Sequence, residues 1–203
     1  MTHTLKLGIL LSGRGSNFEA IARNTLSGAL PVEIAVVISN KPDAKGLEIA
    51  RQLGFDAVAL PSKGLDRETY DLQVVAALRS RGVDLVCLAG YMRLLSAVFV
   101  REFPMRILNI HPSLLPAFPG LDAQQQAFDY GVKVTGCTVH FVDEQLDHGP
   151  IILQSPVPVL PADTAETLSA RILAEEHKIY SEAIGIIAGS KFRIEGRNVV
   201  REV

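Results

Sequence analysis

Cysteine is scarce in this sequence. Only Cys87 and Cys137 occur among the 203 residues, and each lies in an apolar run typical of a β-strand. The two are not spaced as a C-x-x-C pair, so the pattern indicates neither a disulfide framework nor a zinc knuckle. Because free cysteine is one of the residue types most often found in protein interiors, we expect both thiols to be small core side chains.

The sequence also lacks an excess of charge of either sign. Its 20 lysines and arginines and its 22 aspartates and glutamates give a formal net charge of -2 at pH 7. Binding to nucleic acid or to an anionic membrane depends on concentrated basic residues, so we expect neither kind of partner. An anionic substrate would have to be bound by local groups.

A long hydrophobic run is missing as well. The apolar stretch near the N-terminus, LKLGILL, is soon interrupted at Gly13 and is too short for a signal peptide or a membrane span, so we expect a cytoplasmic location. We find no repeat, linker or low-complexity tract, and 48% of the residues are hydrophobic. These features predict one domain over residues 1–203 with a complete core.

The first half of the chain alternates strand-like and helix-like stretches. The apolar runs are LKLGILL, VEIAVVI, DAVAL and DLVCLAG, and the amphipathic stretches between them are NFEAIARNTL, AKGLEIARQLG and DRETYDLQVVAALRSRG. Parallel strands buried on both faces read as such near-continuous apolar runs. The order therefore predicts an α/β fold with a doubly wound, mostly parallel, Rossmann-like sheet.

The pattern changes after Gly90. A short helix in SAVFVREF, a strand in RILNIH, a proline-rich loop and a helix in DAQQQAFDYG are followed by KVTGCTVHFVD and PIILQSPVPV, which have the spacing of a hairpin. We therefore expect the C-terminal side of the sheet to be mixed. A long helix is predicted from Ala165 to about Ala188, with Asp163 and Thr164 as candidate N-caps and a small hairpin after it.

The first predicted strand ends in a glycine-rich loop that runs directly into a helix. In Ser12-Gly13-Arg14-Gly15-Ser16-Asn17, backbone N–H groups and a helix N-terminus are placed where an anion can bind. A dinucleotide fingerprint would need glycine at Phe18, and the Gly-Lys-Ser/Thr ending of a P-loop is missing. Two interpretations remain: a simple turn capped by Ser16 or Asn17, or a site for one phosphate monoester.

Polar side chains are paired at the end of the strand Ile107-Leu108-Asn109-Ile110-His111. The strand period of two puts Asn109 and His111 on one face, and Pro112 then ends the ladder. Ligands of open α/β sheets bind at such strand ends. Asp147, in the turn before Gly149, adds a carboxylate. An amide, an imidazole and a carboxylate together suit acyl transfer to an amine, although each taken alone has a structural interpretation.

Five segments then carry a family resemblance. Ser39-Asn40-Lys41, LAGYMRLLS, NIHPSLLPAFPG, VHFVDEQLDHGPIILQ and AEEHKIY follow one another between Ile9 and about Tyr180. In order and spacing they are similar to the phosphoribosylglycinamide formyltransferase family, whose members formylate glycinamide ribonucleotide in purine synthesis. The resemblance implies 10-formyltetrahydrofolate as cosubstrate, with no metal, and a formyltransferase domain with a nucleotide-binding half at about 1–105 and a catalytic, folate-binding half at about 106–203.

The resemblance also implies roles for individual residues. Asn109, His111 and Asp147 match the catalytic positions. Substrate phosphate and ribose would contact Gly15, Ser16, Asn17 and Glu176. Folate would contact Arg67, Met92, Arg93, Leu94, Leu95, Asn109, Asp143, Glu144, Gln145, Leu146 and Asp147, and the bond before Pro116 would be cis. Two departures are His148, where relatives often have a small residue, and Gln124, where histidine is frequent.

Three rival functions stay open beside this one. A 10-formyltetrahydrofolate hydrolase could use water at the same three residues, although such relatives carry an extra N-terminal domain for which there is no room before Leu5. A methionyl-tRNA formyltransferase would need an RNA-binding domain and a basic surface. A non-catalytic folate- or nucleotide-binding module would not need the catalytic three together. Monomer and homodimer are both compatible with the sequence.

Overall fold

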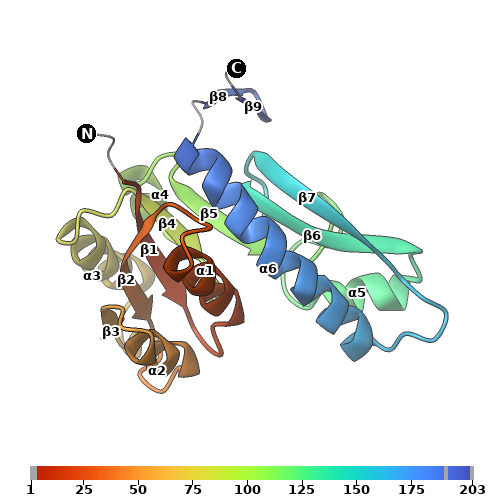
Figure 1. Cartoon of the computed structure of the whole chain (residues 1–203), viewed down its shortest axis with the longest axis horizontal. Coiled ribbons are helices and arrows are strands. Elements are labelled where there is room, and N and C mark those ends of the chain that lie inside the picture. Colours follow the sequence, from red (N-terminus) through yellow and green to blue (C-terminus); the bar gives the residue numbers. More distant parts are fainter. Residues whose placement is uncertain (1–3, 190–191, 202–203) are drawn as a thin grey trace. The chain divides into compact units, whose positions relative to one another are not determined.

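The computed structural model describes residues 4–189 and 192–201 (Figure 1). The chain divides after Leu108 into two compact units, which are described one at a time. Neither unit, within these described ranges, contains a helix that is both long enough and apolar enough to cross a bilayer. Cys87 and Cys137 are buried and form no disulfide, as predicted, and burial raises the pKa of the Cys137 thiol to about 12.

The first unit alternates strands and helices. In chain order it contains β1 (Lys6–Leu11), α1 (Ser16–Leu26), β2 (Glu33–Ser39), α2 (Lys45–Gln52), β3 (Ala57–Ala59), α3 (Arg67–Arg79), β4 (Leu85–Leu88) and α4 (Ala97–Glu102). The strands lie in the order β3-β2-β1-β4 and every pair is parallel. Each apolar run of the sequence has thus become a strand, and each amphipathic stretch a crossover helix.

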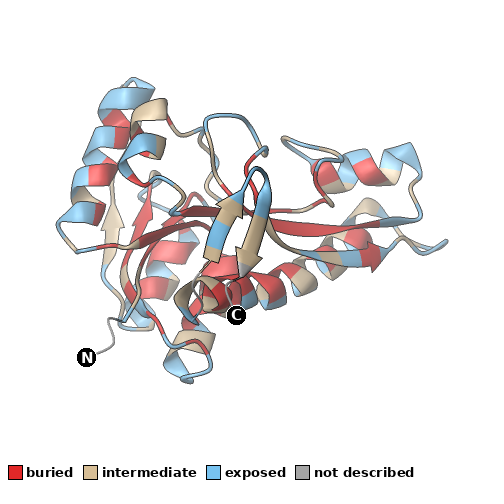
Figure 2. Cartoon of the chain, turned by 90° about the horizontal axis from the view of Figure 1, so that it is seen from above, coloured by how far each residue is buried: buried red, intermediate tan, exposed pale blue. Residues whose placement is uncertain are grey.

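Reversal of the strand order at β1 explains why helices cover both faces of this sheet. The chain moves outward through α1 and α2 to β3 and then returns through α3 to β4. Because such crossovers are right-handed, outward and returning helices lie on opposite faces. The strands between these helices are deeply buried, and Leu7, Ile9, Leu10 and Leu11 of β1 are all 0% exposed. Figure 2 shows this burial along the strands, whereas the outward sides of the helices are exposed.

The second unit contains the longer strands and the longest helix. Its elements are β5 (Ile107–His111), which begins at the end of the first unit, α5 (Ala123–Tyr130), β6 (Val134–Phe141), β7 (Ile151–Pro158), α6 (Ala165–Gly189), β8 (Phe192–Glu195) and β9 (Asn198–Arg201). The strands lie in the order β5-β6-β7-β9-β8. Strands β6 and β7 are antiparallel, β9 is parallel to β7, and β8 is antiparallel to β9.

The predicted mixture of strand directions is therefore confirmed for the C-terminal side. Helix α6 packs on β6 and β7, in agreement with its apolar stripe of Leu168, Ile172, Ile179 and Ile184. Thr164 accepts a hydrogen bond from the backbone N–H of Thr167 at 3.3 Å and so caps this helix. The peptide bond between Leu115 and Pro116 is cis, as predicted.

Candidate active site

The glycine-rich loop of the first unit has the backbone that a small anion site requires. Gly15 is the N-cap of α1 and has a φ of 74°, in the left-handed region. A Cβ atom at Gly15 would lie 2.9 Å from the Cα atom of Gly46, so a side chain would strain both the turn and the packing. Because glycine has no side chain to cap α1, the first N–H groups of this helix are directed toward the loop.

Ser12 ties this loop to two neighbouring strand ends. Its hydroxyl donates to the amide oxygen of Asn40 at 2.6 Å and accepts a hydrogen bond from the backbone N–H of Met92 at 2.8 Å. Its own N–H donates to the carbonyl oxygen of Gly90 at 3.0 Å. The sequence analysis treated Ser12 as an ordinary loop residue. Only the strand order, which puts β1 between β2 and β4, shows that its hydroxyl joins three strand ends.

The segment predicted to bind folate in the first unit follows β4. Met92 and Leu94 are 67% and 54% exposed, whereas Leu95 is half-buried. Arg93 stacks its guanidinium over the ring of Tyr70, 4.5 Å from the ring centre, and so supports the segment from below. Arg67 is exposed at the first position of α3, directly after the capping residue Asp66. Met92 and Leu94 therefore offer apolar surface, and Arg93 offers its backbone.

The second unit brings the three predicted catalytic residues together. Asn109 and His111 come from β5, and Asp147 comes from the loop between β6 and β7. Nδ1 of His111 lies 3.4 Å from Oδ2 of Asp147. Both members of this pair are almost fully buried, since His111 is 4% exposed and the Asp147 side chain is 8% exposed. Charges in a buried site of lower dielectric constant interact more strongly than charges in water.

His140 on β6 is a fourth member of this cluster. Its Nε2 atom lies 3.2 Å from the amide nitrogen of Asn109 and 3.8 Å from Oδ1 of Asp147. The pattern of residues around His140 does not by itself assign it a role in the site. His140 lies in the segment VHFVDEQLDHGPIILQ, but it is the pairing of strands that brings its ring to Asn109.

The hydrogen bonds of His140 define its protonation. Nδ1 faces the carbonyl oxygen of Phe141 at 2.8 Å and must donate its proton there, so Nε2 accepts from the Asn109 amide. Burial lowers the pKa of His140, and the Phe141 carbonyl and the Asp147 carboxylate only partly oppose this effect. A neutral His140 thus fixes which way the Asn109 amide points.

His111 has acceptors on both sides of its ring. Nε2 lies 2.8 Å from the carbonyl oxygen of Phe118, and Nδ1 faces the Asp147 carboxylate. The doubly protonated imidazolium is the form that donates to both. His140 thus accepts a hydrogen bond from Asn109, whereas both ring nitrogens of His111 face acceptors.

Asp147 is held by an unusual backbone. Its φ is 48°, in the left-handed region that non-glycine residues rarely adopt, and Oδ2 accepts a hydrogen bond from the N–H of Gly120 at 2.8 Å. Gly149 closes the loop, because a Cβ atom there would overlap the carbonyl oxygen of Phe141. Such strain is found where the surrounding structure fixes a functional side chain.

The other predicted residues of the second unit lie on α6 and on the loop between β6 and β7. Glu176 is 5% exposed on α6. Leu146 is 57% exposed, and Asp143 accepts a hydrogen bond from the N–H of Gln145 at 2.9 Å, which shapes the loop. Within residues 4–189 and 192–201, no group of three or more His, Cys, Asp and Glu side chains could hold a metal ion.

Comparisons with known proteins identify the kind of molecule that has this arrangement. The family model described as formyl transferase matches residues 5–184. A trifunctional purine biosynthetic protein adenosine-3 of Drosophila melanogaster is 45% identical over 185 residues, which are 90% of this chain and 14% of that protein. The chain thus spans only a small part of the length of this relative. The phosphoribosylglycinamide formyltransferase of Escherichia coli is 41% identical over 94% of this chain and 90% of its own length.

Solved structures give the same result. Glycinamide ribonucleotide transformylase 1 of Symbiobacterium toebii superposes with a TM-score of 0.97 at 53% identity and covers 100% of this chain and 96% of its own. Phosphoribosylglycinamide formyltransferase of Anaplasma phagocytophilum gives a TM-score of 0.91 at 46% identity, over 99% of this chain and 96% of its own. The resemblance found in the motifs and the predicted single-sheet α/β fold with its long C-terminal helix are both confirmed.

Proposed function

This chain belongs to the formyl transferase family, and we propose that it transfers the formyl group of 10-formyltetrahydrofolate to the amino group of glycinamide ribonucleotide. The products are formylglycinamide ribonucleotide and tetrahydrofolate. The observation that supports the chemistry best is the cluster on the second unit, where an oriented amide, an imidazole with two acceptors and a buried carboxylate lie together. These are the groups that acyl transfer to an amine requires.

The reaction begins with attack of the free amine on the formyl carbon. A carbon–nitrogen bond forms, and the carbonyl oxygen becomes the oxyanion of a tetrahedral intermediate. The Asn109 amide carries two N–H groups, of which one donates to His140, so the second can donate to the oxyanion. Nε2 of His111 faces the Phe118 carbonyl oxygen in the free protein. During the reaction its N–H would donate to the oxyanion instead.

Collapse of the intermediate completes the transfer. The bond between the formyl carbon and N10 of the folate breaks, and the proton lost by the attacking nitrogen is delivered to N10. Asp147 accepts that proton or relays it, while its charge keeps the His111 imidazolium in place. No covalent bond to the protein is needed, so serine and cysteine have no part in this scheme.

The two ligands use different sets of residues in the proposal. The nucleotide phosphate accepts hydrogen bonds from the N–H groups of Gly15, Ser16 and Asn17 and from the Ser16 hydroxyl at the start of α1, and Glu176 binds the ribose. Folate binds along Met92–Leu95 and along Asp143–Asp147, with Arg67 near its glutamyl carboxylate. Arg93 takes part through its backbone, because its guanidinium is engaged with Tyr70.

A direct assay tests this function. Purified protein is mixed with 10-formyltetrahydrofolate, and release of tetrahydrofolate is followed by absorbance with and without glycinamide ribonucleotide. We expect release that depends on the nucleotide, together with a formylated nucleotide detected by mass spectrometry. Release without the nucleotide would support the hydrolase instead. Binding of folate without release in either mixture would leave a non-catalytic binding module.

A further inference from the structure

The C-terminal hairpin of β8 and β9 packs against the strands that carry the Asp147 loop. Asn198 of β9 pairs with Ile151, the first residue of β7. Phe192 of β8 stacks on Phe141, the last residue of β6, with ring centres 5.6 Å apart and an interplanar angle of 24°. The hairpin therefore contacts the last residue before the loop and the first strand residue after it.

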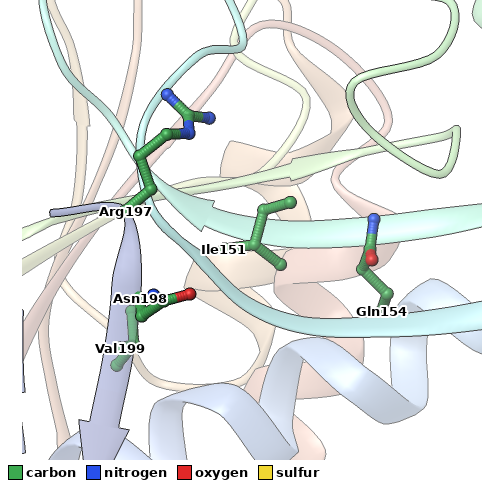
Figure 3. Close-up of a pocket in the computed structure, with 5 residues that line it drawn as sticks. All are labelled: Ile151, Gln154, Arg197, Asn198 and Val199. Atoms are coloured by element: carbon green, nitrogen blue, oxygen red, sulfur yellow. The ribbon is translucent and has the colours of Figure 1, made fainter. Parts of the chain in front are cut away.

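Arg197 extends from this hairpin to the loop itself. A pocket is lined by Ile151, Gln154, Arg197, Asn198 and Val199. Figure 3 shows that the Arg197 guanidinium is turned away from Ile151 and Gln154. It ends at His148, where Nη2 donates to the backbone carbonyl oxygen and Nη1 lies 2.9 Å from ring atom Nε2. Arg197 thus holds both the backbone and the ring of one loop residue.

His148 in turn contacts Asp143 at the other end of the loop. Its Nδ1 atom lies 2.8 Å from Oδ2 of Asp143. If Nδ1 carries the proton and donates it to this carboxylate, Nε2 is left as the acceptor for Arg197. The ring therefore links the guanidinium to the carboxylate, and the loop between residues 143 and 148 is closed across its two ends.

This link bears directly on the neighbouring carboxylate. Asp147 precedes His148 and has the left-handed φ of 48°, a strained conformation that persists only where the surrounding structure enforces it. Gly120 holds the Asp147 carboxylate on one side. The Arg197 contact to the His148 carbonyl oxygen holds the peptide between His148 and Gly149, which follows Asp147 in the chain.

We propose that Arg197 is a positioning residue that fixes Asp147 through His148, so that the C-terminal hairpin takes part in catalysis. This inference rests on the proposed function of the Asp147 loop. It also explains the departure at His148: the large side chain does not crowd Asp147 but serves as the link to the hairpin. Arg197 touches neither substrate in this proposal and acts only through the loop.

Kinetics of Arg197→Ala provide the first test. We expect kcat/KM for the folate to fall about tenfold, because a catalytic group that is slightly misplaced loses much of its effect. The KM for glycinamide ribonucleotide should not change. His148→Ala should have the same effect, and the double variant should be no worse than either single variant. Arg197→Lys, which cannot donate to the ring and the carbonyl as a fork, should recover only part of the loss.

Arg193→Ala is the matched control on the same hairpin. Arg193 is exposed and pairs only with Glu195 within the hairpin in the part of the chain described, with Nε 2.8 Å from Oε1. This variant should keep wild-type kinetics. Equal losses in Arg193→Ala and Arg197→Ala would overturn the proposal, because the hairpin would then matter only as a whole. Additive losses in the double variant would also overturn it.

A spectroscopic measurement separates this inference from the proposed function. The ring ¹⁵N signals of His111 report on the position of Asp147, since Nδ1 faces that carboxylate. They should change in Arg197→Ala and stay unchanged in Arg193→Ala, whether or not the wild type formylates the nucleotide. If the wild type transfers no formyl group but the signals respond, the proposed function fails and the positioning role stands. Unchanged His111 signals in Arg197→Ala would refute the positioning role.

Discussion

The amide of Asn109 is oriented by a neutral histidine. An asparagine side chain can point its oxygen or its nitrogen at a substrate, and only the nitrogen can donate to an oxyanion. His140 accepts from that nitrogen through Nε2, because its Nδ1 proton is committed to the Phe141 carbonyl. If Nε2 of His140 were protonated, its N–H would face the N–H of the Asn109 amide, and neither group could accept a hydrogen bond from the other. Burial keeps His140 neutral and thereby keeps the nitrogen of the Asn109 amide in the orientation that the proposed reaction needs.

Asp147→Asn is a substitution of the same shape that removes one charge. The asparagine oxygen can still accept from the N–H of Gly120, so the loop should keep its backbone. The His111 imidazolium would lose its counter-charge at 3.4 Å, and the relay would lose its base. We expect kcat to fall on the order of a hundredfold or more with little change in either KM. Steady-state kinetics measure both.

Asp129→Asn is a suitable control, because this exposed carboxylate only accepts a hydrogen bond from Gln125 on α5 in the described structure. It should leave kcat unchanged. A near-normal kcat in Asp147→Asn would assign Asp147 to the geometry of the turn and remove it from the chemistry.

His140 also makes stability depend on pH. Its folded pKa lies below the ordinary value of 6.5, so at pH values under 6.5 the unfolded chain binds a proton that the folded chain does not. His140 therefore does not lower the free energy of unfolding above about pH 6.5. Below that pH, the free energy of unfolding decreases as the pH falls. The slope is at most about 1.4 kcal/mol per pH unit. Urea unfolding between pH 7.5 and 5.5 measures it.

The control for this prediction is His140→Gln, which cannot titrate in that range. The slope of its unfolding free energy against pH should be smaller than that of the wild type by the His140 contribution. Identical slopes for the two proteins would mean that folding does not lower the pKa of His140, and the orientation of Asn109 would need another cause.

At the scale of elements, Gly149 is the residue on which the shape of the catalytic loop depends. Phe141 donates its N–H to the Pro150 carbonyl at 2.9 Å, so the loop closes where β6 and β7 come together. The space at Gly149 is filled by the Phe141 carbonyl. Gly149→Ala should lower the free energy of unfolding by roughly 1–3 kcal/mol or more, because backbone must move to make room. It should also reduce kcat.

Gly189→Ala is the matched control for Gly149→Ala. No atom lies within 4 Å of a Cβ at Gly189, and this residue ends α6, where alanine is the better helix former. Its free energy of unfolding should be equal to or above that of the wild type. Chemical denaturation compares the two variants, and equal stability would show that the β6–β7 junction can widen without cost.

Most elements could be predicted from the sequence because burial and periodicity agree. β1 is apolar and buried from Leu7 to Leu11, and α6 shows an apolar stripe that packs on β6 and β7. The loops were less predictable. Asp147 has a left-handed backbone, which aspartate adopts more often than most non-glycine residues but still only occasionally, so its residue type alone does not predict it. The role of Ser12 depends on which strands become neighbours.

At the scale of the whole molecule, the predicted ligand residues divide between the two compact units. The loop of Gly15, Ser16 and Asn17 belongs to the first unit, whereas Asn109, His111, His140 and Asp147 belong to the second. Asn109, His111 and Asp147 could be proposed from the sequence, because an apolar strand that stops at Pro112 and a turn before Gly149 can be recognised in it. It could not add His140, because the pairing of strands far apart in the chain brings that ring to Asn109.

This division predicts that nucleotide binding can be weakened without disturbing the chemistry. Ser16 is the first residue of α1, next to the N–H groups proposed to hold the phosphate. Removing one hydrogen bond to a charged group costs about 1.5–3 kcal/mol, so Ser16→Ala should raise the KM for glycinamide ribonucleotide by about tenfold or more. The KM for the folate and the ring ¹⁵N signals of His111 should not change.

Ser27→Ala, at the other end of the same helix, is the control for Ser16→Ala. Its hydroxyl donates to the Asn24 carbonyl at 3.1 Å on an exposed turn, so neither KM should respond. Kinetics with each substrate varied in turn, and calorimetric titration with the nucleotide, distinguish the outcomes. A rise in the nucleotide KM alone places the phosphate at the start of α1. Equal loss of affinity for both ligands would mean that the glycine-rich loop serves the architecture of the first unit, and the phosphate would have to be sought elsewhere.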